Sequence, residues 1–423
     1  MAGERNTAQP KAARRATARG GVRYEIWAVT FLAFFIAYLD RANVSVLIAD
    51  RGYTQALGIG GDRAAQGLLM SAFLLFYGLA SFLVGPVIAR AGARRTLGGT
   101  LLIWAALLAA MAASASLGVH LAGRALLGLT GAIVAPVCSR LIRTWFPARE
   151  RAKANGAWFV GLQFSLFAGI PLVAAGVAAW GWRWSFLALA VVNAAAALLA
   201  LRRVYDRAEE HPRITPHELE HISGETTAGG AAATFAFLRL RVFWCAAIVY
   251  GLNLAGFWGI VSWLPSYLRT THGLSWTATG GLAAAPYLGN MAALAIFTPL
   301  MDRYDRRAVF TTGACALMLA PMLLLTQARS AAAAVALITL YMACVTVANC
   351  SLFPILQNAT DSNEVATAVG FFTGIAYVCS AAFPYAMGAM YRYTGTLRTS
   401  FLLLVAAGVV SLGATAPMYR RRV

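Results

Sequence analysis

The sequence predicts an all-α membrane protein in which twelve transmembrane helices form two six-helix halves. The first observation is the composition, because 60% of the 423 residues are hydrophobic and only 12% are charged. A soluble globular protein carries about 25% charged residues, so this chain has too little charge to cover a fold surrounded by water. The second observation is a series of long apolar segments, and the third is a loop that occurs twice at equivalent places.

Twelve apolar segments are long enough to cross a bilayer as helices, which takes about 20 residues each. The fifth and the eleventh contain Pro171 and Pro384. A membrane helix tolerates proline when neighbouring helices satisfy the freed backbone groups. The predicted segments are 24–48, 64–89, 97–117, 120–142, 154–178, 184–204, 240–267, 276–301, 308–327, 332–356, 365–390 and 396–418.

The basic residues predict the orientation in the membrane. The chain has 35 Lys and Arg against 16 Asp and Glu, a formal net charge of +19. With the N-terminus inside, 25 of the basic residues lie in cytoplasmic segments and 7 in external ones, and Arg41, Arg124 and Arg140 lie in or at the end of helices. The positive-inside rule therefore predicts a multi-pass protein of the inner membrane with both termini in the cytoplasm. This explanation of the charge removes the reason to expect a nucleic-acid partner.

The longest polar stretch divides the predicted helices six and six, and we interpret it as a linker between two halves. The expected organisation is a basic cytoplasmic tail at 1–23, an N-terminal half at 24–204, a cytoplasmic linker at 205–239, a C-terminal half at 240–418 and a short cytoplasmic tail at 419–423.

One loop pattern follows both the second and the eighth predicted helix. The first copy, at 85–95, reads GPVIARAGARR, and the second, at 298–307, reads TPLMDRYDRR. A loop repeated at the same place in each half is typical of a duplicated transporter. At a constant offset of 213 residues, Pro86 matches Pro299, Arg90 matches Arg303, and Arg94 matches Arg307.

These loops resemble the corresponding loop of the major facilitator superfamily, which reads roughly G-x-x-x-D-R-x-G-R-R. The first copy departs from it at Ala89, where the acid belongs, and the second at Asp305, where the glycine belongs. A narrower resemblance is to the anion:cation symporter family, which imports sugar acids, aromatic acids and similar carboxylates. It rests on YLDRANVS at 38–45, RALLG at 124–128, WFPARER at 145–151, HPRITPHE at 211–218 and WLPSYL at 263–268.

Asp40, Arg41 and Arg124 are charged residues within predicted membrane helices, where a central charge costs about 2.5–3.5 kcal/mol. Asp40 lies 14 residues after Ile26, or about 21 Å along its helix, and Arg124 lies near the outer end of the fourth helix. We therefore expect the three to meet around one cavity. Two arginines can form a forked carboxylate site, and the acid can carry a proton. A snorkelling Arg124 and a structural ion pair of Asp40 remain alternatives.

The resemblance implies that the positions of Arg41 and Arg124 bind the anionic substrate and that Asp40 takes part in proton coupling. Members of the family commonly carry a second membrane acid, which here is replaced by Gly131. One coupled proton through Asp40 is the simplest remaining scheme. A sodium-coupled or an uncoupled anion carrier stays open as an alternative.

Polar residues elsewhere are weaker candidates for the site. The family places a substrate-facing glutamine at the position of Gln163, and five further residues lie at mid-span in the second half. The alternative for each is to join helices by hydrogen bonds. These five are Asn253, Tyr287, Asn290, Asn349 and Tyr377. The repeated loops contribute candidates for a cytoplasmic gate, namely Arg90, Arg94, Asp302 and Arg303.

The predicted function is import of a small organic anion by alternating access. The expected partners are that anion and the lipid bilayer, and we expect a monomer with no cofactor or metal. Residues 217–221 read HELEH and match the zinc-protease motif H-E-x-x-H, but a short linker has no room for a catalytic domain. The six cysteines all lie in apolar stretches and are expected in the core. No group of residues predicts an enzyme. An efflux carrier for amphipathic compounds is the main alternative, and the intramembrane arginines argue against cationic cargo.

Overall fold

The computed structural model describes residues 21–223, 235–304, 306–360 and 364–419. Regular structure in this part of the chain is helical throughout, and it includes twelve segments long and apolar enough to cross a membrane. The predicted fold class is therefore confirmed. Most of the predicted tails at 1–23 and 419–423, and residues 224–234 of the predicted linker, lie outside the described residues.

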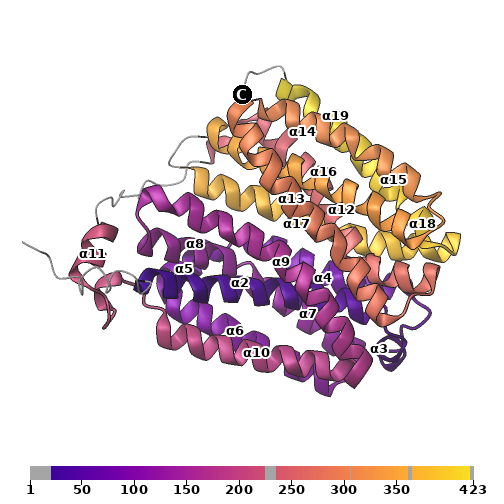
Figure 1. Cartoon of the computed structure of the whole chain (residues 1–423), viewed down its shortest axis with the longest axis horizontal. Coiled ribbons are helices and arrows are strands. Elements are labelled where there is room, and N and C mark those ends of the chain that lie inside the picture. Colours follow the sequence, from indigo (N-terminus) through magenta and orange to yellow (C-terminus); the bar gives the residue numbers. More distant parts are fainter. Residues whose placement is uncertain (1–20, 224–234, 305, 361–363, 420–423) are drawn as a thin grey trace, which may run out of the picture.

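The first six spans form one bundle. They are α2 (Val22–Leu47), α4 (Arg63–Ser81), α6 (Ala93–Ala113), α7 with α8 (Leu117–Gly131 and Val134–Trp145), α9 (Ala148–Trp180) and α10 (Trp182–Arg203). Two short helices, α3 (Arg51–Ala56) and α5 (Val84–Ala91), lie at opposite ends of this bundle (Figure 1).

The last six spans form the second bundle. They are α12 (Arg241–His272), α13 (Trp276–Tyr304), α14 with α15 (Arg307–Leu317 and Leu319–Leu325), α16 (Ala331–Ala359), α17 (Val365–Thr394), and α18 with α19 (Leu397–Ser400 and Leu402–Tyr419). Along the chain, the first bundle is followed by η1 (Ala208–Glu210), α11 (Pro216–Ser223) and η2 (Ala236–Arg239), which precede the second bundle. Pro171 and Pro384 both lie inside continuous helices, α9 and α17.

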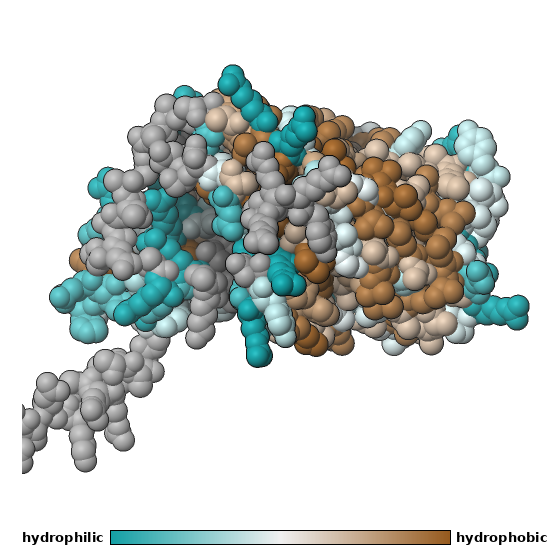
Figure 2. Space-filling model, turned by 90° about the horizontal axis from the view of Figure 1, so that it is seen from above, coloured by the Kyte–Doolittle hydropathy of each residue, from teal (hydrophilic) through white to brown (hydrophobic). Residues whose placement is uncertain are grey.

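Figure 1 shows the two bundles side by side, with α11 at one end and α3 and α18 at the other. We call these the linker end and the α3 end. Both the beginning of α2 and the last described residues lie at the linker end (Figure 1). Figure 2 shows hydrophilic side chains at the linker end and a broad hydrophobic band beside them on the face in view. Such a band is what a bilayer requires of a spanning bundle.

The halves contact each other through α4 against α17, α9 against α13, and α2 against α12. Glycine permits the closest of these approaches. A Cβ atom at Gly67 of α4 would lie 2.2 Å from the Pro384 carbonyl oxygen of α17, and one at Gly388 of α17 would lie 2.2 Å from the Arg63 carbonyl oxygen of α4. Small residues let membrane helices approach closely where lipid supplies no hydrophobic drive between them.

Polar bonds join the halves near the α3 end. Arg392 Nη2 of α17 lies 3.0 Å from Asp62 Oδ1, and Arg63 Nη1 donates to Ser266 Oγ of α12 at 2.9 Å. Asp62 also accepts the backbone N–H groups of Ala65 and Ala64 at the start of α4. The Ala65 bond and the nearby Arg392 hold the pKa of Asp62 below its ordinary value. This carboxylate therefore stays charged and can tie the two halves together.

Candidate substrate-binding site

Asp40 and Arg41 are consecutive residues of α2, and their side chains have partners on different sides of that helix. Successive residues of an α-helix are about 100° apart around its axis because a turn takes 3.6 residues. Asp40 bonds to α10 within the N-terminal half, and Arg41 bonds to α17 of the C-terminal half. The helix therefore presents an acid to one bundle and a base to the junction between the two.

The guanidinium group of Arg41 is enclosed by aromatic rings, which we call the aromatic cage. Arg41 is only 2% exposed, and its Nη1 donates a hydrogen bond of 2.9 Å to the Tyr377 hydroxyl. Ring faces attract a cation within about 6 Å of the ring centre. The distances from Arg41 Cζ to the ring centroids are 4.5 Å for Tyr38, 4.6 Å for Tyr77, 4.9 Å for Phe73, 5.1 Å for Trp258 and 5.6 Å for Tyr377.

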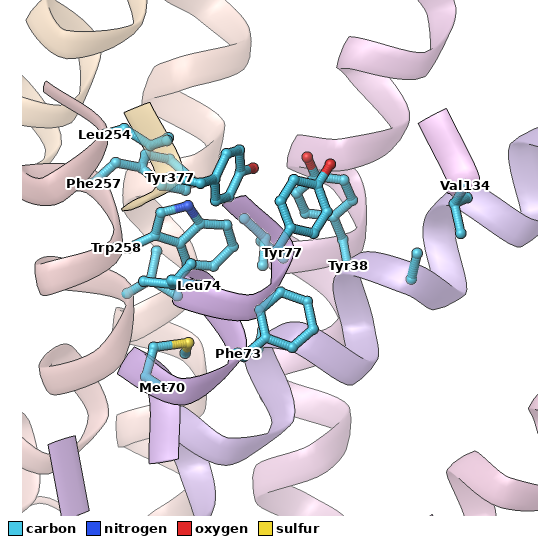
Figure 3. Close-up of a cluster of buried hydrophobic side chains, with 14 of the residues drawn as sticks. Tyr38, Met70, Phe73, Leu74, Tyr77, Val134, Leu254, Phe257, Trp258 and Tyr377 are labelled. Atoms are coloured by element: carbon cyan, nitrogen blue, oxygen red, sulfur yellow. The ribbon is translucent and has the colours of Figure 1, made fainter. Parts of the chain in front are cut away.

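The aromatic cage is built by both halves of the molecule. Tyr38 lies on α2 and Tyr77 on α4, whereas Trp258 lies on α12 and Tyr377 on α17. Figure 3 shows the Tyr377 ring facing those of Tyr38 and Tyr77 across the junction. The centroids of the Tyr77 and Tyr377 rings are 4.2 Å apart. Arg41 therefore lies where relative movement of the halves would change its surroundings.

Arg41 has no acidic partner among the described residues, whose ion pairs within 4.0 Å do not include it. Its Nε atom is buried and has no hydrogen-bond partner. The site thus holds a buried positive charge that ring faces surround and that no carboxylate of the described residues pairs with.

Arg124 has a different environment, although it contacts the same segment of α2. Its Nε donates to the Leu69 carbonyl at 3.0 Å, and its Nη1 and Nη2 donate to the carbonyls of Asp40 at 3.2 Å and Arg41 at 3.4 Å. The side chain is 2% exposed and also lies over the Phe73 ring. In this conformation Arg124 binds backbone oxygens of α2 and α4, and it does not share a fork with Arg41.

The Asp40 carboxylate is held by one side chain. Asn193 Nδ2, on α10, donates to Asp40 Oδ2 at 2.8 Å. Asp40 is 3% exposed, and its other oxygen, Oδ1, is buried without a partner. Arg124 thus contacts the backbone of both Asp40 and Arg41. The three charged side chains themselves have separate partners.

Three further candidates carry buried polar atoms that lack hydrogen-bond partners. These atoms are Gln163 Oε1 on α9, the Tyr287 hydroxyl on α13, and both amide atoms of Asn290, also on α13. Residues 287 and 290 are three apart and so share one face of the helix. The two helices that carry these residues, α9 and α13, pack against each other across the junction of the halves. Trp258 Nε1 of the aromatic cage is also buried and unpaired.

Asn253 and Asn349 are instead bonded within the C-terminal half. Asn253 Nδ2 donates to Asn349 Oδ1 at 3.2 Å, and Asn253 Oδ1 accepts a bond of 3.1 Å from the Ser411 hydroxyl. This cluster joins α12, α16 and α19, as expected for polar residues that hold a helix bundle together.

The four residues predicted as a cytoplasmic gate lie at the linker end, each among residues of its own half. Arg94 Nε donates to the Leu201 carbonyl at 2.7 Å, and Asp302 pairs with Arg307 at 3.3 Å. Arg303 lies against the ring of its neighbour Tyr304, and Arg90 is exposed. The described contacts of this conformation do not bring the four together.

The H-E-x-x-H segment docks α11 against the N-terminal half. Glu218 accepts the backbone N–H groups of Arg23 and Val22, at 3.0 and 3.2 Å, and so caps the first turn of α2. His221 Nε2 lies 3.1 Å from Glu150 Oε1. Among the described residues, no group of three or more His, Cys, Asp or Glu side chains is arranged to hold a metal ion.

Four residues of the site are not among those predicted from the sequence, namely Asn193 and the cage residues Tyr38, Tyr77 and Trp258. Asn193 is an isolated amide in an apolar, alanine-rich helix, the same signal that indicated Asn253. Tyr38 precedes Arg41 by three residues and therefore shares its helix face. Nothing in the sequence places Tyr77 and Trp258 beside Arg41, because that depends on how the two halves pack.

Comparison with known proteins agrees with this architecture. Residues 30–384 match the family model described as Major Facilitator Superfamily. The probable L-galactonate transporter of Escherichia coli K12 is 26% identical over 403 residues, covering 92% of this chain and 87% of the relative. The hexuronate transporter of Bacillus subtilis 168 is 26% identical over 403 residues and 92% of each chain.

A solved structure has the same fold. A bacterial homolog of the human lysosomal transporter Spinster superposes with a TM-score of 0.75 at 16% identity, covering 93% of this chain and 96% of that one. With its twelve apolar helices and the family match, the chain belongs to the Major Facilitator Superfamily and is a multi-pass membrane transporter, not an enzyme.

Proposed function

We propose that this transporter imports a small organic carboxylate together with a proton. The observation that carries the proposal is the guanidinium group of Arg41 at the junction of the halves. It is buried, its Nε has no hydrogen-bond partner, and no carboxylate of the described residues pairs with it. Taking a charged group out of water costs several kcal/mol, and each cation–π contact returns only about 0.5–2 kcal/mol. An anionic ligand would supply the counter-charge that the surrounding residues do not.

The ligand that fits best is a carboxylate on a hydroxylated body. A carboxylate would bond side-on, with one oxygen at the unpaired Nε of Arg41 and the other at the adjacent Nη2, so that Nη1 can keep its bond to the Tyr377 hydroxyl. The unpaired groups of Gln163, Tyr287 and Asn290 would then bond to hydroxyls of the ligand. Two relatives are named as transporters of L-galactonate and of hexuronate, which are sugar acids with this chemistry.

Arg124 has a supporting role in this proposal. Binding an anion would require it to release backbone carbonyls of α2, among them those of Asp40 and Arg41. We therefore assign the anion to Arg41 and assign to Arg124 the positioning of the α2 segment that carries both Asp40 and Arg41.

Proton coupling is assigned to Asp40, which is buried, lacks an ion pair among the described residues and has one unpaired oxygen. An isolated charge is costly in such surroundings, so the carboxyl group can exchange a proton as its surroundings change. The linker end faces the cytoplasm in this scheme, because the basic segments gather there. The present conformation, with polar bonds between the halves near the α3 end, is then the one closed to the outside.

The aromatic cage also favours a second candidate, an efflux carrier for amphipathic cations, since aromatic cages bind organic cations elsewhere. Here, however, the cage is filled by the protein's own Arg41. A cation would have to displace this arginine, whereas an anion would bind beside it.

A thermal-shift screen separates the two candidates. Purified protein is tested with gluconate, glucuronate, tartrate and benzoate, and with tetraphenylphosphonium as an organic cation. We expect stabilisation by at least one hydroxylated carboxylate, lost in Arg41→Gln and retained in Arg183→Gln. Arg183 is an exposed arginine stacked on Trp182, away from the aromatic cage, and so serves as the matched control. Stabilisation by the cation alone, or equal carboxylate stabilisation in Arg41→Gln, would contradict the proposal.

A further inference from the structure

Asn193 of α10 is the side chain that holds the Asp40 carboxylate, and its surroundings differ from those of an ordinary bundle-joining amide. It is fully buried, and its Nδ2 atom makes two bonds, to Asp40 Oδ2 at 2.8 Å and to the Leu189 carbonyl at 2.9 Å. Because Leu189 offers only an acceptor, these bonds identify the nitrogen and the oxygen of the amide. Asn193 Oδ1 is left buried and unpaired.

We propose that Asn193 is a positioning residue that lets Asp40 release its proton, which makes α10 part of the coupling machinery. This inference rests on the proposed proton symport through Asp40. The Nδ2–H bond holds one carboxylate oxygen, and a hydrogen bond to an ionised acceptor is stronger than the same bond to a neutral one. The bond therefore favours the deprotonated form of Asp40 at a place where burial favours the protonated form.

The other groups around Asp40 leave this task to Asn193. Arg124 of α7 lies beside Asp40, but its Nη1 is bonded to the Asp40 backbone carbonyl. Arg41, on the same helix, is directed into the aromatic cage, with tyrosines of α4 and α17 around it. Cys138 of α8 and Ser165 of α9 bond to α2 carbonyls nearer the linker end. The side-chain bond that the structure gives Asp40 is thus the one from α10.

The unpaired oxygens argue against a purely structural amide. In the Asn253 cluster both the nitrogen and the oxygen of the amide are bonded. At Asn193, two oxygens of one hydrogen-bonded pair, Asp40 Oδ1 and Asn193 Oδ1, are buried without partners. A pair that only joined α2 to α10 would gain nothing from two unsatisfied acceptors. A proton on Asp40 Oδ1 would remove one of these unsatisfied acceptors in part of the transport cycle.

The test is the pH dependence of carboxylate affinity, measured on purified full-length protein with the carboxylate that stabilises it most. If binding requires a protonated Asp40, the Kd is constant at low pH and rises tenfold per pH unit above a midpoint. Asn193→Leu removes the bond to the carboxylate and keeps the number and branching of side-chain heavy atoms, so we expect its midpoint to move at least one pH unit upward. Asn193→Ala serves if the leucine variant does not fold. Asn193→Gln retains an amide donor, so its midpoint should lie close to that of the wild-type protein.

Ser185→Ala is the control, because Ser185 is a buried polar residue on the same helix that bonds only locally, to the Trp182 carbonyl. A midpoint in Asn193→Leu and Asn193→Ala equal to that of Ser185→Ala would overturn the proposal for Asn193. Asp40→Asn tests the underlying function separately, because it should abolish the pH dependence altogether. If Asp40→Asn keeps the wild-type pH dependence, the assignment of coupling to Asp40 fails. If it removes that dependence while Asn193→Leu has a wild-type midpoint, the role of Asn193 alone fails.

Discussion

Arg41 and Arg124 contact the same segment of α2, yet their guanidinium groups have different partners. Arg124 uses its planar fork to bind three backbone carbonyls on two helices. Arg41 donates to the Tyr377 hydroxyl and is otherwise surrounded by aromatic rings. One arginine is therefore satisfied by the protein, and the other retains the capacity to bind an anion.

This difference predicts how the two residues respond to the same substitution. Arg124→Lys replaces a fork by a single ammonium group that cannot reach all three carbonyls, and should destabilise the protein by about 3 kcal/mol. Arg41→Lys removes one hydrogen bond and the stacking of a flat cation, so its effect on stability should be smaller. Thermal unfolding in detergent measures both, and a greater loss of stability in Arg41→Lys would contradict this division of roles.

At this scale the sequence predicted which charges lie in the membrane, because the cost of burying them makes such residues conspicuous. It also predicted that Arg124 and the Asp40–Arg41 segment lie at similar depth. It could not predict the side-chain partners. Adjacent residues of one helix diverge around its axis, and the helices they meet are set by the packing of all twelve spans.

At the scale of elements, α4 and α17 form the closest contact between the halves. The contact depends on glycine, since a Cβ at Gly67 would lie 2.2 Å from the Pro384 carbonyl oxygen. We expect Gly67→Ala to weaken this conformation and to separate the halves at the α3 end. The separation is measured as the distance between spin labels at Gln55 of α3 and Thr394 at the end of α17, in protein that lacks its native cysteines. Gly99→Ala is the control, because a Cβ at Gly99 meets nothing within 4 Å. An unchanged distance in Gly67→Ala would show that the contact does not hold the α3 end closed.

The linker helix α11 provides a second prediction. Glu218 accepts two backbone N–H groups at the start of α2, and loss of such a cap costs about 1 kcal/mol. Glu218→Ala should therefore lower thermal stability slightly and speed proteolysis of the linker. Glu220→Ala, at an exposed position of the same helix, should do neither. Equal protease sensitivity of the two variants would rule out this docking role.

The repeated loops show what a pattern at this scale can and cannot predict. The second loop contains an acid, and Asp302 pairs with Arg307. The first loop has Ala89 instead, and the N-terminus of α6 is capped by Asp206, which accepts the N–H groups of Ala93 and Arg94 at 2.5 and 3.0 Å. The acid comes from beyond α10, more than a hundred residues away in the chain. The loop pattern predicted the repeat, but only the fold reveals that Asp206 supplies an acid beside the first loop.

At the scale of the whole molecule, the two halves divide the chemistry unequally. Asp40, Arg41 and Arg124 all lie in the N-terminal half, and the C-terminal half contributes rings and neutral polar groups. Composition, apolar segments and the repeat predicted the two-bundle fold because a bilayer allows few other arrangements. The aromatic cage could not be predicted, since it exists only where Trp258 and Tyr377 of one half meet Tyr38 and Tyr77 of the other. A ligand bound at that junction would sense the movement of both halves.

The central claim is that Arg41 binds a carboxylate whose entry is coupled to a proton. The most direct measurement is uptake of the stabilising carboxylate into proteoliposomes that are acidic outside. We expect accumulation by wild-type protein that a protonophore abolishes, and no accumulation by Arg41→Gln. Accumulation that persists with the protonophore, or in Arg41→Gln, would contradict it.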